Sequence, residues 1–155
     1  MSISNPARTG DVVTETLDGI IIENLTEETL RWESVGTHER GMQLGDGATV
    51  YNHIYDADDN VVGDTVAIVI ATRINESDGH LITEYTEAIN LLGGTLISHG
   101  TLDRNTMWNG EVERFDVIGT SGRFLGMKGI REWQLLPPYP PEDDNRVTVK
   151  ITLSK

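Results

Sequence analysis

Short runs of alternating or apolar residues, separated by Gly, Asn and Asp, cover the chain from residue 47 onward. A period of two residues with turn formers between the runs is typical of antiparallel sheets, and the period of a helix is nearly absent. The connectors have the length and composition of hairpin turns. The pattern predicts strands at residues 29–35, 48–56, 64–74, 81–92, 95–103, 111–119, 129–136 and 147–153.

Eight such strands suffice to close a small barrel and so remove the exposed sheet edges. We therefore predict an all-β fold, an eight-stranded antiparallel up-and-down β-barrel, with an open sandwich as the alternative. Residues 28–155 form the single barrel domain in this prediction. Residues 1–27 are an N-terminal extension whose mixed pattern fits an extra strand, a short helix or a lid over one barrel end. Residues 137–145, PPYPPEDDN, are predicted to be a loop, since proline cannot donate to a ladder.

Composition narrows the classes of protein that this chain can represent. A length of 155 residues fits one domain with a core of its own. The absence of cysteine excludes disulfides and thiolate chemistry and agrees with a cytoplasmic location. A net charge of −13 opposes binding to nucleic acid or to an anionic membrane surface. The longest apolar run, residues 66–71, is too short to span a bilayer.

The histidines of the chain, and the glycines and serine of residues 119–129, do not form common catalytic or cofactor-binding motifs. The four histidines lack HxH or HxxxH spacing, so we expect no metal site. The glycines between residues 119 and 129 precede a predicted strand, whereas a dinucleotide fingerprint opens a helix. The segment GTSGR lacks the GxSxG pattern of a hydrolase elbow.

One strand, within GTSGRFLGMKGIREWQLL at residues 119–136, carries a charge in an unexpected place. One face of this strand is mostly polar and therefore faces solvent. The opposite face is expected to point into the core; it bears Met127, Gly129, Arg131, Trp133 and Leu135. An inward guanidinium is costly unless a carboxylate satisfies it. The candidate partners are Glu28, Glu33 and Glu87; the alternative is an arginine at the barrel rim whose head reaches water.

Further aromatic and polar residues share the predicted inner faces. Tyr85 and Glu87 lie on one side of their strand, and Glu111, Glu113 and Phe115 lie on one side of theirs. Trp133 can be a core filler or part of a cavity wall. Aromatic and polar groups that converge on one interior favour a ligand cavity.

The same segment resembles that of the spirotetronate and spirotetramate cyclases, small bacterial β-barrel Diels-Alderases of polyketide pathways, which carry a G-x-SGR-[YF]-LG-x-x-G-[FI]-R-x-W run. The likeness extends from about Glu28 to Trp133 and is strongest in its last third. More distantly, the barrel resembles allene oxide cyclase and dirigent proteins. The resemblance implies a cyclase without a cofactor or metal, acting on a small linear polyketide, and a homodimer.

The resemblance also implies roles for individual residues. Arg131 and Glu28 would form a salt bridge that acts as a gate or floor at one end of the barrel. Tyr85 and Trp133 would be the catalytic residues, which contact the substrate from the cavity wall. The residues that would line the substrate site are Val50, Glu87, Arg104, Phe115, Met127 and Leu135. Three of these, Val50, Arg104 and Phe115, replace aromatic residues of the relative, so the substrate need not be the same.

The implied reaction is an intramolecular [4+2] cycloaddition. A cavity that folds a polyene into a reactive conformer removes an entropic barrier of up to ~7 to 11 kcal/mol in the best intramolecular cases. Hydrogen bonds from Tyr85 or Trp133 to a carbonyl conjugated with the dienophile would lower the barrier further. Three alternatives remain: a cyclase of an acyl-tetronate polyether, an isomerase like allene oxide cyclase that would use Glu28 or Glu87, and a non-catalytic barrel that binds a hydrophobic ligand.

Overall fold

The computed structural model describes residues 12–35, 43–139 and 146–155. The described strands are β1 (Val13–Glu15), β2 (Gly19–Val35), β3 (Gly47–Tyr55), β4 (Val61–Ile74), β5 (Leu81–Leu91), β6 (Gly94–Asp103), β7 (Glu113–Gly122), β8 (Lys128–Leu135) and β9 (Arg146–Ser154), with one helix, α1 (Arg104–Trp108). Every strand pairs antiparallel with its neighbour in sequence.

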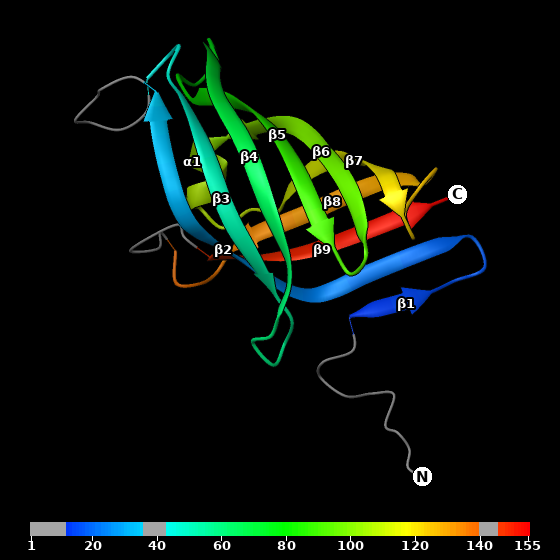
Figure 1. Ribbon diagram of the computed structural model, residues 1–155. Coiled ribbons are helices and arrows are strands. Elements are labelled where there is room, and N and C mark those ends of the chain that lie inside the picture. Colours follow the sequence, from blue (N-terminus) through cyan, green and yellow to red (C-terminus); the bar gives the residue numbers. More distant parts are fainter. Residues whose placement is uncertain (1–11, 36–42, 140–145) are drawn as a thin grey trace.

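Pairing of β2 with β9 closes strands β2 to β9 into a barrel (Figure 1). The predicted eight-stranded antiparallel barrel is therefore confirmed, with β1 as one strand more. The barrel forms because each strand buries one side: β3 and β9, for example, alternate between buried and less buried positions along their whole length.

The barrel begins earlier than predicted. Strand β2 starts at Gly19, so residues 19–27 belong to the barrel wall and not to an extension. Irregular pairing with β9 between Ile22 and Leu25, together with a positive φ of 61° at Asn24, marks a β-bulge. The short strand β1 pairs with β2 from Ile20 to Ile22, and β3 takes over the pairing from Thr26. The N-terminal segment thus supplies an extra strand over residues 13–15, whereas residues 1–11 lie outside the described part of the chain.

The connector between β6 and β7 also differs from the prediction, because it contains α1 instead of a simple hairpin turn. Asp103 caps this helix, since its side chain accepts hydrogen bonds from the backbone N–H groups of Asn105 and Thr106. Within the described residues α1 is five residues long, and no helix there is long and apolar enough to cross a membrane.

The two ends of the barrel have different interiors. The turn end, which carries the β3–β4, β5–β6 and β7–β8 turns, is filled with large apolar side chains, including Ile22, Leu91, Leu96, Phe124 and Leu153. The opposite end, called here the α1 end, carries α1 and the β4–β5 turn (Figure 1). Polar side chains separate the two ends.

Candidate functional site

Arg131 lies inside the barrel, as its strand pattern predicts. Its side chain is 1% exposed, and its Nη2 donates to both carboxylate oxygens of Glu27, at 3.0 and 2.9 Å. The same nitrogen lies 2.8 Å from Oε1 of Glu87, which is fully buried. One guanidinium is therefore clamped between carboxylates from β2 and β5.

Hydrogen bonds extend this cluster across the barrel. Thr65 donates to Oε2 of Glu87 at 2.6 Å, and Asn52 donates to Thr65 at 2.7 Å and to Glu87 at 3.2 Å. We call Glu27, Asn52, Thr65, Glu87 and Arg131 the polar layer; all five are buried. The layer connects β2, β3, β4, β5 and β8, and it forms a floor beneath the interior of the α1 end.

The predicted pairing of Arg131 with Glu28 is wrong by one residue. Glu28 points outward, where it lies 3.2 Å from Nε of Arg146 and accepts a hydrogen bond from Tyr55 at 3.3 Å. Glu33, another candidate, pairs with Arg31 on exposed surface. Of the three predicted partners, only Glu87 contacts Arg131.

The bulge at Asn24 explains the error. Before it, Ile20 and Ile22 face the interior; after it, Leu25 and Glu27 do. An extra residue in a strand reverses which positions face inward, because side chains alternate with a period of two. The inner position is therefore Glu27.

Burial and neighbouring charges shift the pKa values of Glu27 and Arg131 in the polar layer. Desolvation, together with the charge of Glu87, raises the pKa of Glu27 to about 7, and Arg131 only partly offsets this. Desolvation lowers the pKa of Arg131, but the charges of Glu27 and Glu87 together outweigh it and raise the pKa, so the guanidinium keeps its charge. Glu27 therefore takes up a proton as the pH falls through about 7.

This proton gives a testable pH dependence. The folded pKa of Glu27 lies above the ordinary 4.5, so its contribution to stability is complete below about pH 4.5 and is lost as pH rises to about 7. Glu27→Gln mimics the protonated acid and does not titrate. We expect the free energy of unfolding of this variant, relative to wild type, to rise with pH over that range and then level off, as measured by urea unfolding. The outward variant Glu28→Gln is the control, and an unchanging difference for Glu27→Gln would contradict the assignment.

Three aromatic side chains lie together above the polar layer, at the α1 end. The rings of Tyr85 and Phe115 are stacked with centroids 5.7 Å apart, and the Trp133 ring lies 5.7 Å from Phe115 and 6.4 Å from Tyr85. Gly100 pairs with Tyr85 on the strand between them, and a Cβ there would lie 2.2 Å from Cδ1 of Phe115. Glycine is therefore what lets the rings of two non-adjacent strands meet. We call Tyr85, Phe115 and Trp133 the aromatic wall.

Small side chains lie on the other side of Tyr85. Ala48, Val50, Ala67 and Val69 are buried on β3 and β4 and pack against the tyrosine; we call them the small-residue wall. Tyr85 itself stays partly accessible, although its inner-face neighbours Thr83 and Glu87 are fully buried. Space therefore remains beside its ring.

Two residues beside these walls carry buried hydrogen-bond donors without a partner in the described part of the chain. The indole nitrogen of Trp133 and the Nε and Nη1 atoms of Arg131 are buried and have no acceptor among the described residues. The pKa of the Tyr85 hydroxyl is raised, mainly by desolvation, so the group stays a donor. Unpaired buried donors are unfavourable and are strong positions for an oxygen acceptor to bind.

The structure brings most of the predicted site residues together. Tyr85, Trp133, Phe115 and Val50 surround one interior, and Glu87 lies in its floor. Leu135 is buried two residues beyond Trp133, and Arg104, at the start of α1, is close enough to affect the charge balance of Tyr85. Met127 does not join them, because it precedes Gly129, which pairs with Leu153 at the packed turn end.

Trp32 is a site residue that the sequence pattern did not indicate. A second irregularity in β2, between Thr29 and Arg31, reverses the alternation again and pairs Trp32 with the buried Val50 and Ser34 with the buried Ala48. Paired residues share a face of the sheet, so Trp32 lies on the inner side at the α1 end. It is 43% exposed and donates to Ser34 at 2.7 Å.

Another group that the spacing of the histidines concealed lies near the β4–β5 turn. Nδ1 of His80 is 2.8 Å from Asp103 and 3.3 Å from Asp78, and the hydrogen bond to Asp103 raises the pKa of His80. Their ligand atoms lie within 4.8 Å of one another, close enough to hold a metal ion. The carboxylate of Asp103 is already bonded to the N-terminus of α1 and to His80. We therefore interpret Asp78, His80 and Asp103 as a structural contact that ties the β4–β5 turn to α1.

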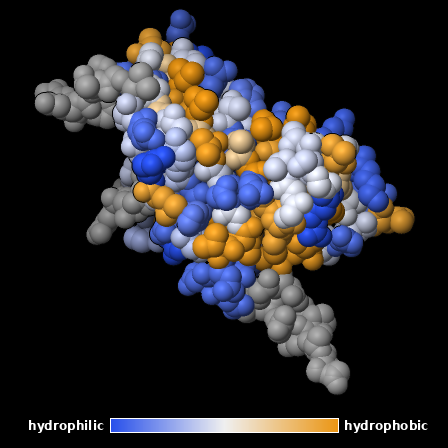
Figure 2. Space-filling model, in the orientation of Figure 1, coloured by the Kyte–Doolittle hydropathy of each residue, from blue (hydrophilic) through white to orange (hydrophobic). Residues whose placement is uncertain are grey.

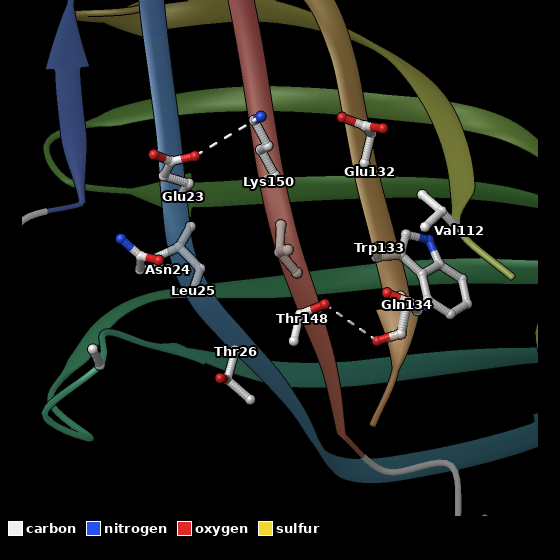
Figure 3. A pocket seen from close by; sticks show the side chains of 12 residues that line it. Glu23, Asn24, Leu25, Thr26, Val112, Glu132, Trp133, Gln134, Thr148 and Lys150 are labelled. Carbon is white, nitrogen blue, oxygen red and sulfur yellow. Dashed lines mark hydrogen bonds and ion pairs between the residues drawn. The ribbon is translucent and has the colours of Figure 1, made fainter. Parts of the chain in front are cut away.

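A groove of about 580 Å³ crosses the outer wall of β2, β9 and β8 (Figure 3). Its lining mixes polar and apolar side chains and includes Glu23, whose carboxylate lies 3.8 Å from the ammonium of Lys150. Trp133 is the one predicted site residue in its lining. The groove lies open on the outer wall and does not enclose a ligand, and the unpaired donors and the aromatic wall lie inside the barrel, so we place the candidate site at the α1 end.

A closed barrel with a polar floor and an aromatic wall defines a class of ligand-enclosing antiparallel barrels. The chain belongs to the family described as allene oxide cyclase barrel like domain, whose model matches residues 25–153. No curated protein sequence matches the chain.

Solved structures extend the comparison to cycloaddition enzymes. AbnU, described as an exo-specific intermolecular Diels-Alderase, is 25% identical, with a TM-score of 0.74 over 87% of this chain and 96% of that chain. The Diels-Alderase AbmU from Streptomyces koyangensis is 24% identical, with a TM-score of 0.75 over 87% of this chain and 63% of that one. A cyclase described as binding heme nonspecifically and catalysing [4 + 2] cycloaddition in neoabyssomicin biosynthesis is 24% identical, with a TM-score of 0.76 over 87% and 66%. This chain thus spans less than two thirds of the last two chains, and the predicted resemblance to barrel Diels-Alderases is confirmed.

Proposed function

We propose that this protein is a cofactor-independent cyclase that catalyses an intramolecular [4+2] cycloaddition of a linear polyene tetronate or tetramate. The observation that carries the proposal is the interior at the α1 end, where an aromatic wall and a small-residue wall meet above a polar floor. The likeness to AbnU, described as an intermolecular Diels-Alderase, supports a [4+2] cycloaddition; the intramolecular form is part of the proposal.

Apolar walls suit the task of folding a flexible polyene. The barrier of an intramolecular cycloaddition is largely the loss of chain freedom, and binding in a reactive conformer removes part of it. Tyr85 is the residue that contacts both walls, and the polar layer below it sets how far a chain can enter.

Two donors can activate the dienophile. Tyr85 has a hydroxyl that stays protonated, and Trp133 has an indole N–H without an acceptor among the described residues. A hydrogen bond from either to a carbonyl conjugated with the alkene withdraws electron density and lowers the barrier. Arg131, held by Glu27 and Glu87, keeps the floor in place in this scheme.

An isomerase like allene oxide cyclase is less well supported. That reaction would need a carboxylate near the reacting centre, but Glu28 lies on the outer wall. Glu87 and Glu27 are both engaged by Arg131. A barrel that only binds a ligand would return the polyene unchanged.

Variants of the two donors test the mechanism. We expect Trp133→Phe and Tyr85→Phe each to lower kcat by about tenfold or more and to change KM less, because the lost hydrogen bond strengthens in the transition state. Single-turnover rates of cyclisation would measure this. Equal kcat for both variants and wild type would rule out the donor role.

Trp32 offers a prediction about substrate binding. Trp32→Ala removes an aromatic side chain, 43% exposed, from the inner side of the α1 end. We expect KM to rise by about tenfold from the lost apolar contact, with kcat nearly unchanged and a loss of stability below about 1 kcal/mol. Ile118→Ala, at a site 53% exposed on β7, is the control and leaves KM unchanged. A normal KM in Trp32→Ala would show that Trp32 does not contact the substrate.

A further inference from the structure

Arg104, the first residue of α1, lies on the inner side of the barrel at the α1 end. On β6, Ser98 and Leu102 are buried, so the even-numbered positions point inward. Asp103 is still extended, with φ −87° and ψ 111°, which carries this alternation to the end of the strand. Asp103 bonds to His80, and Arg104, half-buried, follows on the side of Leu102.

Bonds at both ends of α1 fix the place of Arg104. The helix contacts β5, β6 and β8, and two of these strands carry residues of the aromatic wall. At its start, Asp103 accepts from the helix N–H groups and lies 2.8 Å from Nδ1 of His80. Just beyond its end, the backbone oxygen of Gly110 accepts a hydrogen bond from Gln134 of β8 at 2.6 Å. A charge held on a rigid element can select the orientation of a ligand.

The charges around Tyr85 differ between the floor and the α1 end. Desolvation and the carboxylates of the floor raise the pKa of Tyr85, whereas the cations of Arg131 and Arg104 partly offset this. Arg131 is clamped between Glu27 and Glu87, so the floor carries one cation and two carboxyl groups. The charge of Arg104 acts on Tyr85 from the α1 end. An anion is therefore favoured at the α1 end rather than at the floor.

The proposed substrate carries such an anion. An acylated tetronate or tetramate ring is a vinylogous acid that is ionised at neutral pH, while its polyene is neutral and apolar. A net charge of −13 repels an anion from the outer surface, where hydrophilic residues are spread between hydrophobic ones on the face that Figure 2 shows. Binding the ring thus needs a local cation. The acids that flank α1 bond to other groups, Asp103 to His80 and Glu113 to Thr106, at 2.8 Å each.

We propose that Arg104 binds the ionised headgroup of an acyl-tetronate or acyl-tetramate and so sets the orientation in which the substrate enters. This inference rests on the proposed function. The headgroup oxygens accept from the guanidinium at the α1 end, and the polyene extends between the aromatic wall and the small-residue wall toward the floor. The dienophile, next to the ring, then lies on the side of Tyr85 and Trp133. Arg104 is a specificity-determining residue and takes no part in bond formation.

Binding of an unreactive headgroup tests the inference apart from catalysis. The probe is acetyltetronic acid, which has the acidic ring but no diene, and its O-methyl ether is the neutral counterpart; isothermal titration calorimetry measures both. We expect wild type to bind the acid more tightly than the ether, Arg104→Gln to raise the Kd of the acid by about tenfold or more, and Arg104→Lys to restore most of the affinity. Arg114→Gln is the control, because it removes the same charge from a site 63% exposed on β7 and leaves the Kd unchanged.

Kinetics with the linear substrate separate this inference from the proposed cyclase. We expect Arg104→Gln to raise KM by about tenfold with little change in kcat, and added salt to raise KM in wild type more than in the variant. Cyclisation with an unchanged KM in Arg104→Gln would overturn the role of Arg104 and leave the proposed function standing. Binding of the acid that depends on Arg104, without cyclisation, would support the inference and contradict the cyclase. Equal affinity of wild type and Arg104→Gln for the acid would overturn the inference.

Discussion

Arg131→Met is expected to lower the free energy of unfolding by about 3–5 kcal/mol at neutral pH, because it leaves two buried carboxyl groups without their cation. Glu27 and Glu87 are 7% and 0% exposed and lose their shared partner together. Water cannot replace the guanidinium at such depth, so the carboxyls must take up protons to stay buried. Chemical unfolding at pH 7 measures the loss, which we expect to shrink as pH falls.

Two controls separate the buried charge from the shape of the side chain. Arg146→Met removes an arginine that is 41% exposed and pairs with Glu28 on the outer wall, and it is expected to cost less than about 1 kcal/mol. Arg131→Met combined with Glu27→Leu and Glu87→Met replaces the whole ionic cluster by apolar groups and should recover most of the stability. A loss as small as that of Arg146→Met would show that Arg131 is not held by the two carboxylates in solution.

Gly100→Ala is expected to cost about 1–3 kcal/mol of stability through overpacking, and to lower the rate of cyclisation as well. The new Cβ would lie 2.2 Å from Cδ1 of Phe115, a fully buried ring that has nowhere to retreat without leaving Tyr85 and Trp133. The change thus disrupts the aromatic wall without touching a hydrogen-bonding group. Urea unfolding and the single-turnover rate measure the two effects.

A second substitution at the same contact shows whether crowding is the cause. Phe115→Ala removes Cδ1 and the other ring atoms that the new methyl group would strike. In the double variant, Gly100→Ala should therefore cost less than it does alone, a favourable coupling between neighbours. Strictly additive costs would contradict the contact.

The sequence predicted the fold well because each strand has one buried side and the turns carry Gly, Asn and Asp. Strands β3 to β9 lie close to their predicted positions. The start of β2 was missed because β2 is interrupted by two irregularities, between Ile22 and Leu25 and between Thr29 and Arg31. At each irregularity the alternation of inward and outward side chains shifts by one residue, so a pattern of period two is interrupted.

The same two irregularities limited what could be said of the site. The inward direction of Arg131 and its need for a carboxylate followed from desolvation, and Glu87 was among the expected partners. The irregularities in β2 decide which of its side chains point inward. The inward positions of Glu27, in place of Glu28, and of Trp32 therefore follow only from the strand pairing in the structure. The contact of His80 with Asp103 joins residues 23 positions apart, which no local motif records.

The most direct test of the proposed function is to incubate the purified protein with a linear tetronate that carries an exocyclic alkene and a terminal diene. We expect loss of diene absorbance faster than in buffer, a product of unchanged mass by mass spectrometry, and slower turnover in Trp133→Phe. Recovery of the linear compound at the rate of the buffer control, although it binds the protein, would contradict a cyclase acting on this substrate and favour a binding barrel.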